Sequence, residues 1–114
     1  MIHTIDSEAF AALRDTTGSD FVRELIDTFL QEAPGMLADL AQSLAALDAD
    51  RFRRAAHSLK SNGNTFGALA LGALARDLEL AGVDAVAARG ADALAPVEAE
   101  YARVAAALRE LRDE

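Results

Sequence analysis

One of the two histidines of this 114-residue chain lies in a basic stretch, residues 53–68, RRAAHSLKSNGNTFGA. On a helix drawn at about 100° per residue, His57 falls on the polar side with Arg53, four residues earlier, and Lys60, three residues later. Neighbouring cations disfavour a protonated imidazole, and a neutral imidazole has a free lone pair and can act as a nucleophile. The same cations would balance an arriving anion such as a phosphoryl group. From the pattern alone, an ordinary histidine on a charged helix face remains the alternative.

The two sides of this predicted helix differ in composition. The polar side also carries Ser61 and Asn64, and Ser61 is small enough to leave space beside the imidazole for a bulky electrophile. The opposite side is apolar, and we expect it to be buried. Its members are Phe52, Ala55, Ala56, Leu59, Gly63 and Phe66.

A carboxylate is expected beside His57 once this helix folds back against the next one. If the connection centres near residue 68, an antiparallel hairpin pairs positions whose numbers sum to about 136, so that position 57 faces Glu79. A carboxylate there could accept a hydrogen bond from one ring nitrogen, fix the tautomer and leave the other nitrogen outward. The second histidine, His3, has no patterned neighbours, and we assign it no role.

The rest of the sequence predicts further helices that position this hairpin. Apolar residues make up 52% of the chain, mainly alanine and leucine, and β-branched residues are sparse, which favours an all-α bundle. We expect one domain over residues 1–114, with Pro34 breaking or kinking the chain between two helices. The expected helices cover residues 8–15, 21–33, 36–47, 50–64, 68–82, 84–89 and 94–111.

The composition argues against several classes of site and partner. The chain has no cysteine and its two histidines lie far apart, so we expect no disulfide, no thiolate nucleophile and no metal site. The net charge of −8 argues against nucleic acid as a partner. No run of about 18 apolar residues and no secretory pattern is present, so we expect no membrane span and a cytoplasmic protein.

The residues around His57 resemble the histidine phosphotransfer (HPt) domain family. The family pattern is approximately Ala-His-x-Leu-Lys-Gly, then a glycine about ten residues after the histidine, then leucine repeats that end in Leu-Glu. The matching residues of this chain are Ala56-His57-Ser58-Leu59-Lys60-Ser61, Gly67, Leu71, Leu74 and Leu78-Glu79. The upstream stretch 21–40, with its proline, also resembles the family's second and third helices. One residue departs from the pattern, since Ser61 replaces the common glycine.

The resemblance implies a fold and a set of roles. The fold is an up-and-down four-helix bundle with an additional short N-terminal helix. The function is that of a phosphorelay intermediate, in which His57 is the phospho-acceptor, Lys60 balances the phosphoryl charge and Glu79 orients the imidazole. Gly67 would let the loop and helix pack without crowding the site. Arg53 is added to the site from the helical pattern alone.

The resemblance also implies the partners, which are receiver domains of response regulators and of hybrid sensor histidine kinases. The receiver brings its own aspartate and Mg²⁺, so we expect no cofactor on this chain, which would act as a monomer. The stretch SNGNTFG lacks the Gly-Lys-Ser/Thr of a nucleotide-binding loop, so the chain is expected to carry a phosphoryl group without using ATP itself. The alternative is a non-catalytic helical adaptor that binds a partner through an exposed helix face. The dimerisation hairpin of a histidine kinase is not expected, because it needs a long symmetric hairpin and a following ATP-binding domain.

Overall fold

The computed structural model describes residues 4–114, and His3 lies outside this range. The described chain folds into six helices and contains no strand, which confirms the predicted all-α class. The helices are α1 (Ser7–Thr17), α2 (Ser19–Ala46), α3 (Ala49–Thr65), α4 (Leu69–Ala81), α5 (Val83–Ala87) and α6 (Ala95–Arg112). None of them is long and apolar enough to cross a membrane.

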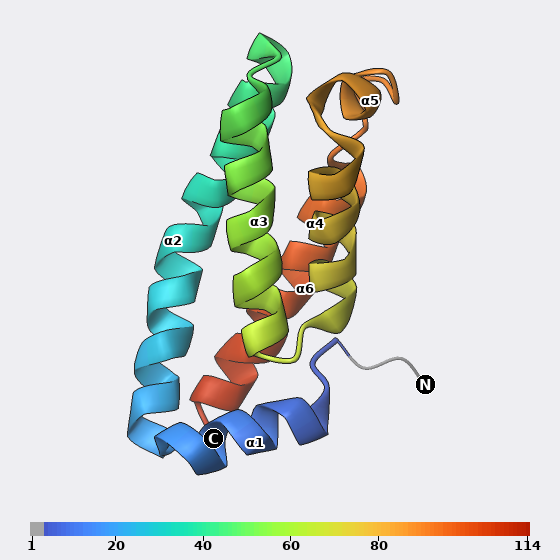
Figure 1. Cartoon of the computed structure of the whole chain (residues 1–114). Helices are drawn as coiled ribbons and strands as arrows, with labels where there is room; N and C mark the ends of the chain where they lie inside the picture. Colours follow the sequence, from blue (N-terminus) through green and yellow to red (C-terminus); the bar gives the residue numbers. More distant parts are fainter. Residues whose placement is uncertain (1–3) are drawn as a thin grey trace.

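The four longest helices form the predicted up-and-down bundle. In Figure 1, α2, α3, α4 and α6 run alternately up and down, α1 lies across the lower end and α5 lies at the upper end. Helix α3 packs against both α2 and α4, and α6 packs against α2 and α4. The helix that carries His57 is therefore supported on two sides by neighbouring helices.

The core of the bundle is built from apolar stripes at helical spacing. All six residues predicted for the apolar side of α3 are buried. Phe29 of α2 lies at the centre, with ring centroids 5.5 Å from Phe66 and 6.0 Å from Tyr101. Burying a leucine or phenylalanine side chain contributes about 1.5–3 kcal/mol, so this stripe fixes the rotation of α3 and directs its polar side outward.

Pro34 does not separate two helices as the sequence predicted. Helix α2 continues through it from Ser19 to Ala46, so the two expected helices are one element. A proline inside a helix removes one hydrogen bond and costs about 3 kcal/mol. Pro34 itself is exposed, whereas Phe29, Ala33 and Leu40 are buried on both sides of it. The packing of this continuous apolar stripe therefore overrides the local preference of the proline.

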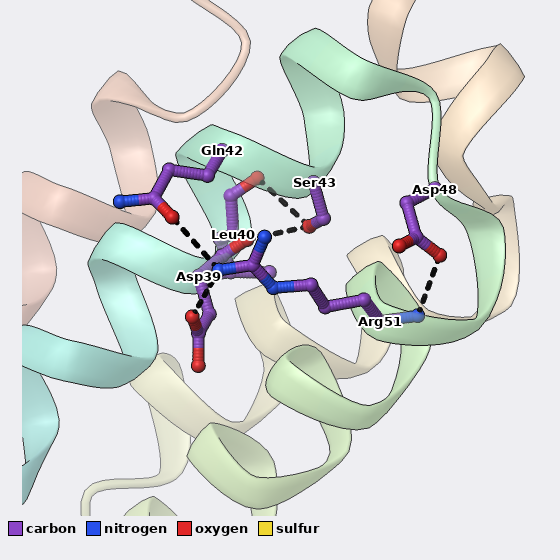
Figure 2. A network of polar contacts seen from close by, with 6 residues as sticks. All are labelled: Asp39, Leu40, Gln42, Ser43, Asp48 and Arg51. Atoms are coloured by element: carbon purple, nitrogen blue, oxygen red, sulfur yellow. Dashed lines mark hydrogen bonds and ion pairs between the residues drawn. The ribbon is translucent and has the colours of Figure 1, made fainter.

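A polar network fixes the turn between α2 and α3 (Figure 2). The guanidinium Nη2 of Arg51 donates to the Oδ1 of Asp39 at 2.6 Å and to the Oε1 of Gln42 at 2.8 Å. Asp48 caps α3, because its Oδ1 accepts a hydrogen bond from the backbone nitrogen of Arg51 at 3.2 Å. The buried hydroxyl of Ser43 donates to the carbonyl of Asp39. These contacts set the starting point of the helix that carries His57.

Gly67 lies in the loop between α3 and α4, where it meets the start of α1. Its φ is +81°, and its carbonyl accepts a hydrogen bond from the backbone nitrogen of Asp6 at 2.8 Å. A Cβ atom at this position would lie 3.0 Å from the Cβ of Ala9 and 3.0 Å from the carbonyl oxygen of Asp6. Glycine is therefore required for the contact between this loop and α1, and its expected effect on the site stays a prediction.

We predict that Gly67→Ala destabilises the protein by about 1–3 kcal/mol, because alanine is strained at this φ and crowds α1. Gly35→Ala is the matched control, since Gly35 lies inside α2 with open space around it. The control should be neutral or more stable, as alanine is the better helix former. Urea unfolding of both variants measures the difference. Equal stabilities for Gly67→Ala and wild type would contradict this account of the loop.

Candidate functional site

His57 projects from the solvent side of α3. Its neighbours Ala56 and Leu59 are fully buried, whereas the His57 side chain is 56% exposed. This difference follows from the helical period, which places residues one or two positions apart on different sides. The histidine is therefore accessible to a reactant while its backbone belongs to the packed bundle.

The carboxylate of Glu79 on α4 contacts both His57 and Lys60. Its Oε2 lies 2.8 Å from the Nδ1 of His57, and its Oε1 accepts a hydrogen bond from the Nζ of Lys60 at 2.6 Å. The Glu79 side chain is only 15% exposed, so this bridge is largely shielded from water. The structure thus brings together the three residues that the hairpin register and the family resemblance had singled out.

The bridge determines which nitrogen of His57 carries the proton. The hydrogen bond from Lys60 is the largest influence on the pKa of Glu79, and it lowers this pKa. Desolvation raises the pKa, and the contact with His57 lowers it further. Glu79 is therefore ionised at neutral pH, and a carboxylate can only accept hydrogen bonds. The Nδ1 of His57 must then carry the proton, which leaves the lone pair of a neutral ring on Nε2.

The cations near His57 form ion pairs with carboxylates, which the sequence did not predict. Lys60 is bound to Glu79 and is 24% exposed, so it is not a fully solvated charge. The Nη2 of Arg53 donates to the Oδ1 of Asp50 at 2.9 Å. Arg54 contacts the other oxygen of Asp50 at 3.2 Å. Arg53 is therefore paired within the first turn of α3, and its expected role beside His57 stays a prediction.

Ser61 and Asn64 have different surroundings. Ser61 is exposed one helical turn after His57, where its small side chain leaves the approach to the ring open. Asn64 packs over Gly72 of α4, since a Cβ atom at that glycine would collide with the Asn64 amide. Asn64 is therefore a contact between α3 and α4, two turns away from His57.

Arg76 of α4 was not among the residues predicted for the site. This arginine lies between Gly72 and Glu79, three residues before Glu79, and it is exposed. It forms no ion pair within residues 4–114. The spacing of residues 72, 76 and 79 places Arg76 on the same side of the helix as Glu79, and this spacing is visible in the sequence.

The site is an open surface and not a cleft. A cavity of about 510 Å³ between α1 and the end of α6 includes Phe10, Arg14 and Leu111 but not His57. In the described part of the chain, no cluster of three His, Asp or Glu side chains could hold a metal ion. The His57 side chain is therefore open to a partner from outside the bundle.

We predict that Glu79→Gln reduces the dependence of stability on pH. A carboxyl group whose pKa is lowered by folding stabilises the protein above its ordinary pKa, about 4.3, and loses this effect as the pH falls through the lower value. Urea midpoints between about pH 5 and pH 3 should therefore fall less in Glu79→Gln than in wild type. Glu24→Gln, a change at an exposed acid on α2, is the control and should follow wild type. Identical pH profiles for all three proteins would contradict the bridge.

Comparisons with known proteins agree with this geometry. The family model of the Hpt domain matches residues 24–114. The crystal structure of histidine-containing phosphotransfer protein B (HptB) from Pseudomonas aeruginosa PAO1 is similar to the whole chain, with a TM-score of 0.82 and 27% sequence identity over 99% of this chain and 97% of that one. No match was found among curated protein sequences. The chain belongs to the Hpt domain family, whose members are histidine phosphotransfer intermediates of two-component phosphorelays.

Proposed function

We propose that His57 is the residue that carries the phosphoryl group, bonded through Nε2. The observation that supports this assignment is the 2.8 Å contact between Nδ1 of His57 and the ionised carboxylate of Glu79. The contact holds a proton on Nδ1 and leaves the Nε2 lone pair free on a side chain that is 56% exposed. An exposed, oriented and unprotonated ring nitrogen is what a nucleophile for phosphoryl transfer requires.

The transfer step needs only positioning and charge balance from this chain. The Nε2 lone pair of His57 attacks the phosphorus of an aspartyl phosphate, and a P–N bond forms while the P–O bond to the aspartate breaks. The aspartate leaves as a carboxylate with the bonding electron pair. The ring becomes positively charged, and Glu79 stabilises that charge through the hydrogen bond from Nδ1. The reverse sequence passes the phosphoryl group to a second aspartate.

Lys60 is placed to support the charge of the transferred group. Its ammonium has three donors, and one of them is used by Glu79 at 2.6 Å. The remaining donors can contact phosphoryl oxygens on the neighbouring His57 without loss of the bridge. Lys60 thus links the carboxylate that orients the ring to the anion that the ring accepts.

The partners proposed for this chain are receiver domains of response regulators and of hybrid sensor histidine kinases. Hpt domains interact with receiver domains. The chain has a net charge of −8, but Arg53, Arg54, Lys60 and Arg76 lie on or beside the face that carries His57, and this face suits an acidic partner. Mg²⁺ in this reaction would be held by the receiver. We further propose that the protein acts as a monomer in the cytoplasm, a reducing setting that suits a chain without cysteine.

We predict that His57→Gln abolishes phosphoryl transfer from a phosphorylated receiver domain. Wild type should acquire a label that is stable in alkali and labile in acid, and His3→Gln is the control that should retain it. The measurement is radiolabel on the separated protein after incubation with several phosphorylated receivers. Label that persists in His57→Gln, or wild type that stays unlabelled with every receiver, would support the helical adaptor instead.

Lys60→Ala should slow transfer by about tenfold, because one charge-assisted contact to the phosphoryl group is lost. Helicity should change little, since Lys60 lies at the rim of the core. Arg89→Ala removes a comparable ion pair, 2.7 Å from Asp77, and should transfer like wild type. Both variants are tested by their transfer rates, measured in samples quenched at successive times, and by their helicity, measured by circular dichroism. An unfolded Lys60→Ala protein, or one with an unchanged rate, would contradict the proposed role.

A further inference from the structure

Most of the positive charge near His57 is already balanced by carboxylates. Lys60 is paired with Glu79 at 2.6 Å, and Arg53 and Arg54 share Asp50 at 2.9 and 3.2 Å. The pair of Lys60 and Glu79 has no net charge. A phosphoryl group on His57 would add a charge of about −1.5 to −2 to this surface. The paired cations alone leave that new charge only partly compensated.

Arg76 lies on the side of α4 that faces this region. Gly72 contacts Asn64 of α3, and Glu79 contacts His57 of α3, so both residues face α3 across the hairpin. Arg76 follows Gly72 by four residues and precedes Glu79 by three, and this spacing places it on the same side of the helix. It starts about 4.5 Å along the helix axis from Glu79, a distance that an arginine side chain readily spans.

The surroundings of Arg76 leave its side chain available. It is exposed and forms no ion pair among the described residues, 4–114. Its helix is anchored in the core by Leu71, Ala75 and Leu78, which are buried. The base of the arginine is thus fixed while its guanidinium is free to turn toward the imidazole.

We propose that Arg76 binds the phosphoryl group carried by His57, with its planar guanidinium donating to phosphoryl oxygens. The proposal rests on His57 being the phospho-acceptor. Arginine suits this task because two parallel N–H groups can engage two oxygens at once. Lys60 is already paired with Glu79, so it compensates the phosphoryl charge only in part. Arg76 would supply the remaining positive charge. The site then holds the phosphorylated ring between Lys60 on α3 and Arg76 on α4.

The test phosphorylates the whole protein chemically with phosphoramidate, so that no partner protein is needed. The ³¹P NMR signal of the phosphohistidine is titrated with pH in wild type, Arg76→Ala, Arg76→Lys and Arg109→Ala. A guanidinium beside the phosphoryl group favours its dianion, so its titration midpoint should rise by about one unit in Arg76→Ala and less in Arg76→Lys. Arg109 on α6 is the matched control, because it is also exposed and has no ion pair within residues 4–114.

The outcomes distinguish this inference from the proposed function. Wild type that takes up phosphate on His57, together with an Arg76→Ala midpoint equal to that of wild type, would overturn the role of Arg76 alone. Wild type that takes up no phosphate on His57 would overturn both proposals. Equal shifts in Arg76→Ala and Arg109→Ala would reflect net charge and would also overturn the specific contact. Urea unfolding of each variant verifies that the bundle is intact.

Discussion

The carboxylate of Glu79 contacts His57 and Lys60 at the same time, and the geometry of the site depends on this bridge. The two contacts, at 2.8 and 2.6 Å, join α3 to α4 across the hairpin. They also keep the carboxylate ionised, because the hydrogen bond from Lys60 lowers the pKa of Glu79. An ionised carboxylate cannot donate, so it fixes the proton on Nδ1 and leaves the lone pair on Nε2, the nitrogen that we propose as the nucleophile.

The bundle serves this bridge by holding two helices in one register. The buried stripe of α3 sets its rotation, the Arg51 network and the Asp48 cap set its start, and the contact of Gly67 with α1 holds the loop that follows it. The contact between Asn64 and Gly72 gives the same pairing of helices as the contact between His57 and Glu79. These two contacts, at different positions along the helices, therefore fix the imidazole relative to its carboxylate.

The sequence was sufficient for the bundle and for the three residues of the bridge, because both follow from helical periodicity and from the length of one short loop. It was not sufficient where tertiary packing determines a helix boundary or where a nearby carboxylate determines the ion pair of an arginine. The helix through Pro34 depends on apolar contacts with neighbouring helices, which a local proline rule does not include. Arg53 is drawn to Asp50, a competitor within its own turn. The position of Arg76 beside α3 depends on the packing of the two helices, which its own helical pattern does not reveal.

The most direct test of the central claim is the tautomer of His57 in the free protein, measured by ¹⁵N NMR of the imidazole at a pH where the ring is neutral. The account predicts that Nδ1 carries the proton and that Nε2 has the chemical shift of an unprotonated nitrogen, with this pattern lost in Glu79→Ala. A ring protonated on Nε2 in the wild-type protein would contradict the account, because the nucleophilic lone pair would then face Glu79.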